Sequence, residues 1–312
     1  MAIKKIKVGV TGLGFIGSQV CRNLLYNGYD VIAIDNFYLD QCDHAMSLFN
    51  YPNFIFEECN ILNFNKIQSI FSKCDAIIHT AGIVGAPKVD SNIEFSKAVN
   101  INGTKNIVEI ANNRPLVNCS TGSIYGKITD ICTEDCALNP TSNYGIHKKI
   151  AEDIVTNTNN TISLRFATGC GVGSKYRLTL LPNTLVYLAI KERSLNVFEA
   201  DANRTFIHVQ DMSTALIWAM ERILYQKEYY KYYNCGDESC NWSKRELAEY
   251  IKLKTGCSVS YNDTQKDPDQ RDYKVSYDRI NNHGWKAQYN MSQIIDELIR
   301  ACKLINITHQ YQ

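Results

Sequence analysis

A glycine-rich turn near the N-terminus constrains the fold of this chain more than any other feature. Residues 5–10 place apolar side chains at alternate positions and predict a strand, and the turn TGLGFIG at residues 11–17 leads directly into apolar positions at helical spacing. Three glycines at such a turn have separate roles. Gly12 permits the tight turn, Gly14 lets the backbone approach a pyrophosphate, and Gly17 lets the helix pack close to the strand. The pattern therefore predicts a dinucleotide-binding unit.

The residues after the turn indicate which dinucleotide is bound. Phe15 and Ile16 open the helix, whose N-terminus offers free N–H groups and a positive dipole end to phosphates. A second strand over residues 31–34 ends at Asp35, about 20 residues beyond the turn, where a carboxylate accepts hydrogen bonds from ribose hydroxyls. That carboxylate repels the 2′-phosphate of NADP, and residues 36–39 supply no cation. We therefore expect NAD as the cofactor.

Strands and helices alternate through the first half of the chain. Further strands are predicted at residues 54–59, 76–79, 116–120 and 163–166, and helices at residues 92–112 and from residue 144 to about 155. Such alternation is typical of an α/β protein whose parallel Rossmann sheet is doubly wound, with helices on both faces. The ligands of such a sheet bind beyond the carboxyl ends of its strands.

Tyr144 and Lys148 form the strongest candidate for chemistry. Residues four apart share one face of a helix, so the phenol and the ammonium can reach the same substrate atom. A nearby cation favours the phenolate and lowers the pKa of a tyrosine from its ordinary value of about 10. The pair suits removal of a proton from a sugar hydroxyl. Taken alone, the same spacing also occurs on exposed helices without function, and only the glycine-rich turn favours the catalytic interpretation.

Composition excludes several other classes of protein. The 312 residues carry 33 basic and 32 acidic side chains with no basic run, so we expect no nucleic-acid partner. The sequence contains no apolar stretch of membrane-spanning length and no signal-peptide core, and we expect a cytoplasmic protein without a membrane partner. The twelve cysteines lack zinc-binding spacing, so we expect reduced thiols and no metal site.

Six further motifs follow in order along the chain: HTAG at residues 79–82, NINGT at 100–104, STGSIYG at 120–126, LRF at 164–166, RTFIHVQD at 204–211 and DPDQRDY at 267–273. With these motifs, nearly the whole length resembles the extended short-chain dehydrogenase/reductase family, specifically its NAD-dependent nucleotide-sugar epimerase/dehydratase branch. One departure is Asn60, where that family usually has an aspartate that holds the adenine amino group. An asparagine can still accept a hydrogen bond through its carbonyl oxygen.

The resemblance implies roles for the matched positions. Tyr144 is the expected general base, Lys148 lowers its pKa and binds the nicotinamide ribose, and Thr121 hydrogen-bonds the oxygen that is oxidised. These three are the expected catalytic residues. The cofactor-binding residues that the resemblance implies are Gly12, Gly14, Phe15, Ile16, Gly17, Asp35, Asn36, Asn60, Ile61, Thr80, Ala81, Gly82, Asn100, Tyr144 and Lys148.

The resemblance also implies a substrate-binding lobe. Arg204 and Arg271 resemble the family's diphosphate-binding arginines, whose guanidinium groups meet phosphate oxygens in a bidentate way. The expected substrate-binding residues are Val84, Thr121, Ser123, Asn183, Arg204 and Arg271. We expect an NAD-binding Rossmann domain with the catalytic residues at 1–171 and a smaller C-terminal α/β lobe at 172–312, which binds mainly the nucleotide sugar and returns some segments to the first domain. His208 and Asp211 are expected to anchor a loop and to cap a helix over residues 213–223.

Residues next to the catalytic threonine narrow the reaction that the resemblance implies. Family members that act as 4,6-dehydratases have an Asp-Glu pair after this threonine, and here Gly122 and Ser123 occupy those places. The decarboxylating relatives also have a glutamate there, and the 3,5-epimerases use a cysteine where this chain has Ser123. We therefore expect NAD-dependent oxidation at carbon 4 of a nucleotide-diphosphate sugar, by a 4-dehydrogenase or a 4-epimerase.

Two segments, residues 168–183 and 266–276, look closest to a subgroup of 4-epimerases and GDP-heptose 4-dehydrogenases of surface-polysaccharide biosynthesis. The resemblance implies a GDP- or UDP-linked sugar as the substrate. It also implies a homodimer that pairs the helices at residues 92–112 and 143–156 with their copies. Three alternatives stay open: a nucleotide-sugar 4,6-dehydratase, a carbonyl reductase that uses NADPH, and a non-catalytic module that senses NAD.

Overall fold

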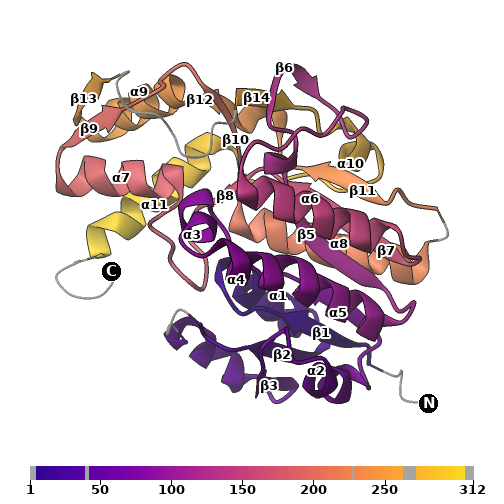
Figure 1. The fold of residues 1–312 in the computed structure, drawn as a ribbon. Coiled ribbons are helices and arrows are strands. Elements are labelled where there is room, and N and C mark those ends of the chain that lie inside the picture. The colour runs from indigo at the N-terminus through magenta and orange to yellow at the C-terminus, as the bar shows by residue number, and fades with distance from the viewer. Residues whose placement is uncertain (1–4, 39–41, 227, 263–271, 306–312) are drawn as a thin grey trace.

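A parallel sheet dominates the N-terminal half of the molecule (Figure 1). The computed structural model describes residues 5–38, 42–226, 228–262 and 272–305, and within these ranges the sheet has seven strands in the order β11-β7-β5-β4-β1-β2-β3. All neighbouring pairs are parallel. The strands are β1 (Lys7–Thr11), β2 (Asp30–Asp35), β3 (Phe54–Glu58), β4 (Ala76–His79), β5 (Leu116–Thr121), β7 (Thr161–Phe166) and β11 (Tyr232–Cys235).

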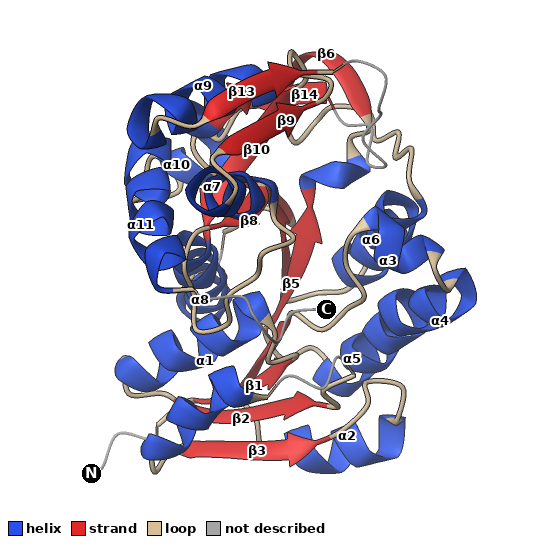
Figure 2. Cartoon of the chain, turned by 90° about the vertical axis from the view of Figure 1, so that its left-hand side faces the viewer, coloured by secondary structure: helices blue, strands red, loops and turns tan. Residues whose placement is uncertain are grey.

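Helices cover both faces of this sheet, as Figure 2 shows. On one face lie α1 (Phe15–Tyr26) and α8 (Val209–Tyr225), and on the other lie α2 (Phe64–Phe71), α5 (Gly103–Ala111) and α6 (Asn143–Thr156). Each face buries its own apolar cluster, one around Val20, Leu24 and Leu216 and the other around Ile67 and Ile107. The arrangement confirms the predicted doubly wound Rossmann sheet.

The helix predicted at residues 92–112 contains an irregular turn. The structure divides it into α4 (Ile93–Lys97), a π-helical segment η2 (Ala98–Asn102) and α5, after the short helix α3 (Ala86–Asp90). Apolar spacing does not distinguish one wide turn from regular helix, so the sequence did not indicate it. Such π turns are often found at functional sites. Here the turn contains Asn100, one of the predicted cofactor-binding residues.

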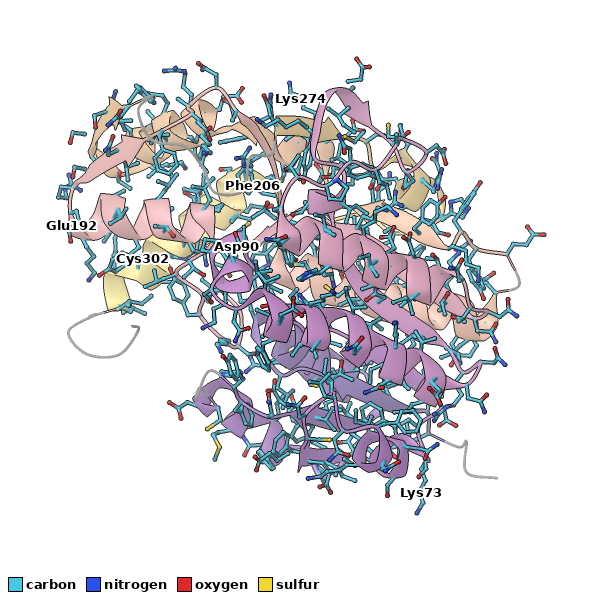
Figure 3. The ribbon with its side chains drawn as sticks, viewed as in Figure 1. Lys73, Asp90, Glu192, Phe206, Lys274 and Cys302 are labelled. Atoms are coloured by element: carbon cyan, nitrogen blue, oxygen red, sulfur yellow. The ribbon has the colours of Figure 1, made fainter. Side chains whose placement is uncertain are left out.

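The C-terminal lobe lies beyond the end of β5 and has a core of its own. Phe206 and Cys302, labelled in Figure 3, are buried members of that core. The short helix α10 (Asp278–Asn282) packs on β11, and its buried Ile280 belongs to the core of the large sheet. The elements of the lobe are β8 (Thr168–Cys170), α7 (Leu181–Lys191), β9 (Ser194–Val197), β10 (Asn203–His208), β12 (Asn241–Ser243), α9 (Lys244–Thr255), β13 (Ser258–Tyr261), β14 (Asp272–Val275) and α11 (Met291–Leu304). Three small sheets join them: β12-β10-β8, β13-β9 and β14-β6, the last with β6 (Lys127–Cys132).

Some late segments lie against the first half of the chain. Strand β11 extends the large sheet, and β14 pairs with β6. The division into domains at residues 1–171 and 172–312 stays a prediction, and this pairing is compatible with it. One smaller expectation was wrong: α8 begins at Val209, not at residue 213, and His208 is its N-cap. Asp211 lies in the first turn, where its carboxylate accepts the backbone N–H groups of Gln288 and Tyr289.

Candidate active site

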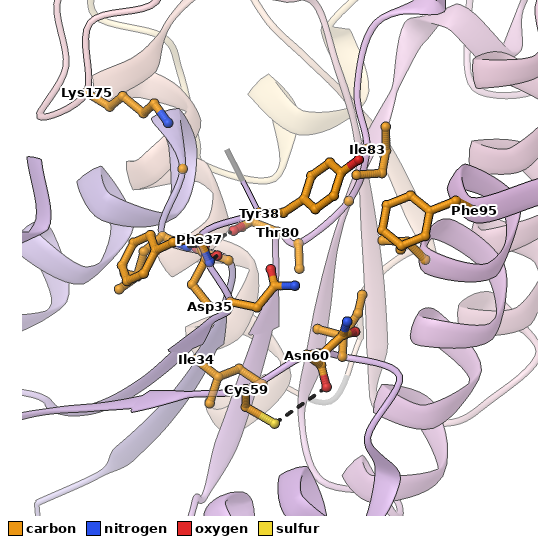
Figure 4. Close-up of a pocket in the computed structure, with 18 of the residues that line it drawn as sticks. Ile34, Asp35, Phe37, Tyr38, Cys59, Asn60, Thr80, Ile83, Phe95 and Lys175 are labelled. Atoms are coloured by element: carbon orange, nitrogen blue, oxygen red, sulfur yellow. Dashed lines mark hydrogen bonds between the residues drawn. The ribbon is translucent and has the colours of Figure 1, made fainter. Parts of the chain in front are cut away.

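A pocket opens at the carboxyl ends of β1, β2 and β4 (Figure 4). Nine of the predicted cofactor-binding residues line it: Gly12, Gly14, Asp35, Asn36, Asn60, Ile61, Thr80, Ala81 and Gly82. Phe15, Ile16 and Gly17 form the start of α1 beside it. Residues outside the predicted cofactor-binding set also line it, namely Leu13, Ile34, Phe37, Tyr38, His44, Cys59, Ile83, Phe95, Val99 and Lys175.

The glycine-rich turn has the geometry that a dinucleotide requires. Gly12 has a φ of +83°, and a Cβ built on it would lie 2.8 Å from the backbone of Ala81. A Cβ on Gly17 would lie 1.7 Å from the carbonyl oxygen of Gly12. A Cβ on Gly14, in contrast, would meet nothing within 4 Å, and no side chain caps α1. Open space thus lies before uncapped N–H groups at a helix N-terminus, which suits a pyrophosphate.

Asp35 is held firmly at the end of β2. Its carboxylate accepts hydrogen bonds from the backbone N–H of Leu13 at 2.6 Å and of Phe37 at 2.7 Å. The carbonyl oxygen of Leu13 is in turn hydrogen-bonded by His44. Each carboxylate oxygen can accept more than one hydrogen bond, so Asp35 can still bind the ribose hydroxyls of NAD.

Asn100 fixes the loop that follows β4. Its amide oxygen accepts the N–H of Ile83 at 2.8 Å, and its amide nitrogen donates to the carbonyl of Ile83 at 2.9 Å. A Cβ on Gly82 would lie 2.9 Å from the same amide oxygen. Asn100 therefore shapes one wall of the pocket through Ile83. On the other wall, the amide oxygen of Asn60 accepts the N–H of Leu62 and retains a second lone pair for an adenine amino group.

Lys148 is tied to the strand that carries the predicted catalytic threonine. Its Nζ donates a hydrogen bond of 2.5 Å to the carbonyl oxygen of Cys119 in β5. Cys119 and Thr121 are two residues apart on the same strand, and alternate residues face the same side of a sheet. Burial lowers the pKa of Lys148, and interactions with Cys119 and Glu152 oppose that effect. A desolvated ammonium in this position suits the stabilisation of a nearby phenolate.

The N-terminus of α6 packs against the turn after β5. The Thr121 hydroxyl accepts the N–H of Ser123 and donates to the Ser123 hydroxyl, both at 3.2 Å. A Cβ on Gly145 would lie 2.8 Å from the carbonyl oxygen of Ser123, so a glycine beside Tyr144 allows α6 to approach this turn closely. The packing brings the element with Tyr144 and Lys148 against the element with Thr121.

Gly122 faces a tyrosine from the far end of the chain. A Cβ on Gly122 would lie 2.8 Å from the hydroxyl oxygen of Tyr273, while its next contacts would be at 3.5 Å. Tyr273 belongs to β14, is 5% exposed, and packs edge-on against Tyr125. The site therefore has little room for any side chain at residue 122.

The predicted substrate-binding residues occupy different environments. Val84 is half-buried in the loop after β4, and Ser123 is buried beside Thr121. Arg204 is buried in β10, and one guanidinium nitrogen donates to the carbonyl of Asn203. Asn183 is fully buried, and its amide bonds both the N–H and the carbonyl of Gly171 at 3.1 Å. Arg271 lies outside the described residues.

Two basic residues near the site carry no sequence motif. Lys175 lines the pocket, and Arg177 interacts electrostatically with Tyr144, which opposes the lowering of the Arg177 pKa by burial. Both lie in the segment between β8 and α7. No local spacing in the sequence relates Lys175 or Arg177 to Asp35 or Tyr144. Their location within residues 168–183 was the one sequence feature that connected them with the site.

Within the described ranges, no group of three or more His, Cys, Asp or Glu side chains is arranged to hold a metal ion. Among the helices of the same residues, none is long and apolar enough to cross a membrane.

Comparison with known sequences gives one family and several curated relatives. Residues 8–236 match the NAD dependent epimerase/dehydratase family. A bifunctional UDP-glucose 4-epimerase and UDP-xylose 4-epimerase of Pisum sativum is 26% identical, over 94% of this chain and 95% of the relative. A UDP-glucose 4-epimerase of Bacillus subtilis is 25% identical, over 82% and 84%.

Solved structures share the fold over nearly the whole chain. The UDP-glucuronic acid 4-epimerase of Bacillus cereus, solved with UDP-glucuronic acid and NAD, has a TM-score of 0.83 at 21% identity and covers 96% of this chain and 99% of its own. The dTDP-glucose 4,6-dehydratase of Bacillus anthracis, solved with NAD, has a TM-score of 0.80 at 22% identity and covers 95% and 96%. At these identities the likeness establishes the fold and leaves the reaction open.

Proposed function

Because the chain belongs to the NAD-dependent epimerase/dehydratase family, we propose that it oxidises carbon 4 of a nucleotide-diphosphate sugar, as a 4-epimerase or a 4-dehydrogenase. Family membership confirms the resemblance drawn from the motifs, and with it an NAD-dependent enzyme that acts on nucleotide sugars. The choice of reaction and the roles of single residues are the proposal.

The proposed mechanism assigns one step to each catalytic side chain. NAD, when bound, would accept the hydrogen on carbon 4 as a hydride. Tyr144 removes the proton from the 4-hydroxyl as general base. Lys148, desolvated and held at the carbonyl of Cys119, keeps positive charge near the phenol and favours its ionised form. Thr121 orients the oxygen that becomes a carbonyl.

The observation that favours this reaction over 4,6-dehydration is the contact between residue 122 and Tyr273. Elimination of water requires an acid and a base near carbons 5 and 6, and the resembling dehydratases have an Asp-Glu pair directly after the threonine. In this chain Gly122 and Ser123 carry no carboxylate. Any side chain at residue 122 would meet the Tyr273 hydroxyl, with its Cβ already at 2.8 Å. Without that acid, oxidation at carbon 4 is the chemistry that the residues support.

For the substrate we propose a UDP- or GDP-linked sugar. The named relatives act on UDP-sugars, which supports a nucleoside diphosphate as the group recognised. Arg204 in β10 is proposed as one diphosphate ligand, with Arg271 as a second. Asn183 is proposed to lie in the same region of the substrate lobe, where its amide binds the backbone of Gly171. A GDP-heptose of surface-polysaccharide synthesis is the more specific candidate, and it rests on the resemblance of residues 168–183 and 266–276 alone.

Two other classes of function make different predictions. A carbonyl reductase would use NADPH, whereas Asp35 places a fixed carboxylate at the ribose position and disfavours a 2′-phosphate. A non-catalytic NAD sensor would have no need for Thr121, Tyr144 and Lys148 together. Retention of all three in one packed unit favours an enzyme.

We also propose that the protein acts as a homodimer. Ile146 and Ile150 of α6 are 40% and 37% exposed and lie on one helix face, since they are four residues apart. Ile93 of α4 is 41% exposed as well. Apolar side chains exposed on these two helices support the predicted pairing of the helices with their copies.

A substrate panel tests the proposed reaction. The purified protein is incubated in deuterated water with UDP-, GDP-, dTDP- and CDP-sugars, with and without 2-oxoglutarate as oxidant, and the products are identified by NMR. A 4-epimer formed without oxidant identifies a 4-epimerase, and a 4-keto sugar formed with oxidant identifies a 4-dehydrogenase. Loss of the 6-hydroxyl with deuterium at carbon 6 would identify a dehydratase and refute the proposal.

A further inference from the structure

A segment of the C-terminal lobe reaches the cofactor pocket. Lys175 follows β8 and lines this pocket together with Gly14 and Asp35, which belong to the glycine-rich turn and to β2. Figure 4 shows its side chain extending toward the pocket from a separate part of the chain. A lysine on a loop is most often solvated, but the contacts of residues 171–174 restrict the position of this one.

Residues 171 and 172 are fixed to the C-terminal lobe. Gly171 has a φ of +88°, and Asn183 of α7 bonds both its N–H and its carbonyl. The N–H of Val172 donates to Glu297 of α11 at 3.1 Å, and the same carboxylate oxygen pairs with His208 at 2.7 Å. The buried side chain of Asn183 and the partly exposed side chain of Glu297, from two different helices, thus determine where the segment leaves the lobe.

Residues 173 and 174 lie against the helix that follows the glycine-rich turn. A Cβ on Gly173 would lie 3.0 Å from the side chain of Val209 in α8 and 3.5 Å from the ring of Phe15 in α1, so the backbone packs against the first residue of both helices. The hydroxyl of Ser174 donates to the Gln19 side chain at 3.3 Å, and Gln19 also donates to Gln210 at 2.6 Å. Lys175 is therefore the next residue after a stretch that is held to both halves of the molecule.

The surroundings of Lys175 favour the binding of an anion. Burial lowers the pKa of its ammonium, Asp35 opposes this, and Arg177 lowers the pKa further. Asp35 is already bonded by the N–H groups of Leu13 and Phe37. The pocket that Lys175 lines also contains the open space before Gly14, where the helix N-terminus favours phosphate. A diphosphate there would neutralise the ammonium.

We propose that Lys175 binds the diphosphate of the bound dinucleotide, so that the C-terminal lobe supplies part of the cofactor site. The segment at residues 171–175 then holds Lys175 at the cofactor from the side of the C-terminal lobe. The inference depends on NAD binding and is independent of which sugar is oxidised. Its failure and the failure of the proposed reaction are therefore distinguishable.

Calorimetric titration of the nucleotide-free full-length chain tests the proposal. Lys175→Met should weaken the binding of NAD and of ADP-ribose at least about tenfold, because a charge-assisted hydrogen bond is lost. The affinity for adenosine, which has no phosphate, should stay the same. Lys175→Arg should retain most of the NAD affinity, and Lys73→Met, an exposed lysine remote from the pocket (Figure 3), should retain all of it.

Three outcomes would overturn the proposal. Unchanged NAD affinity in Lys175→Met would mean that the ammonium is solvated. An equal loss for adenosine would mean that Lys175 acts through Asp35 and the ribose. A loss larger for NADP than for NAD would place the ammonium at the 2′ position.

If Lys175→Met does not fold, the salt dependence of NAD binding is compared between the wild type and Lys175→Gln, and an equal slope would contradict a phosphate contact.

Discussion

At the scale of single residues, Gly122 shows how a missing side chain shapes the site. The residue lies directly after Thr121 and faces the buried hydroxyl of Tyr273. Glycine is needed here for space, and its backbone angles place no demand on it, since no positive φ occurs at this position. The absent Cβ and the tyrosine hydroxyl form one steric unit, which a pair of substitutions can test.

Gly122→Ala should destabilise the protein by about 1–3 kcal/mol, because the new methyl carbon would lie 2.8 Å from the hydroxyl oxygen of Tyr273 and would overpack the site. Tyr273→Phe should remove most of that cost in the double variant, since the remaining contacts of the Cβ are at the ordinary distance of 3.5 Å. Chemical unfolding of the two single variants and the double variant measures the coupling. Additive effects would show that the hydroxyl is not the obstacle.

Tyr144→Phe should lower turnover at least about a hundredfold, the lower range for a positioned acid or base. The ring remains, so folding and cofactor binding should be preserved, with a loss of NAD affinity far smaller than the loss of turnover; calorimetry and thermal unfolding measure these two controls. Steady-state kinetics on the identified substrate measures the loss. Near-normal turnover would move the general base to another residue.

At the scale of elements, the π-helical segment η2 positions a side chain that a regular helix would place elsewhere. Asn100 lies within this segment, is 3% exposed, and uses both ends of its amide on the backbone of Ile83. The segment thereby couples the helix of α4 and α5 to the loop that follows β4, which lines the pocket.

Asn100→Ala should lower the free energy of unfolding by about 1–3 kcal/mol, since it leaves the N–H and carbonyl of Ile83 without this partner. NAD affinity should fall as well, because the loop shapes the pocket. Asn102→Ala is the matched control: it is exposed, lies in the same segment, and should change stability by less than about 0.5 kcal/mol. Equal effects of both variants would show that only helix propensity is involved.

At the scale of the whole molecule, two features lead to predictions. One is the exposed apolar faces of α4 and α6, and the other is a buried histidine at the centre of the sheet. Dimerisation concerns the outer surface of the helices, and the histidine concerns the pH range in which the fold is stable. Both depend on how elements pack, and both can be measured without knowledge of the substrate.

Light scattering should find a dimer at micromolar concentration. Replacing Ile146 and Ile150 together by glutamate should produce monomers, because the charges would be buried at the proposed interface. Leu253→Glu is the control, since Leu253 is 78% exposed on α9, away from that face, and should leave the dimer intact. A monomeric wild-type protein would refute the proposed assembly.

Stability should rise with pH between about 3 and 6.5 in part because of His79. Burial, with Lys148 second, lowers the pKa of His79 from 6.5 to about 3. In that range the unfolded chain binds a proton that the folded chain does not, so acid favours unfolding. Thr11 and Thr104 hydrogen-bond both ring nitrogens. Urea unfolding of His79→Gln should show a shallower dependence on pH, and an unchanged slope would contradict this.

The sequence by itself determined six strands of the large sheet, the glycine-rich turn and the position of Asp35 relative to that turn, whereas the seventh strand, β11, was not predicted. These features depend on periodicity and spacing over a few residues, where local geometry decides the conformation. The strand at residues 76–79 has the predicted bounds, and β5 continues one residue further, to Thr121. Tyr144 and Lys148 were identifiable for the same reason, since one helical turn separates them.

The tertiary structure alone decided which distant segments complete the site. Lys175 reaches the pocket only because Asn183, Glu297 and Gln19 hold the segment before it. Tyr273 opposes Gly122 only because β14 pairs with β6. Contacts of this kind depend on the course of the whole chain and on the packing of buried side chains. Neither the course of the whole chain nor this packing produces a periodic pattern or a characteristic spacing in the sequence near the residues concerned.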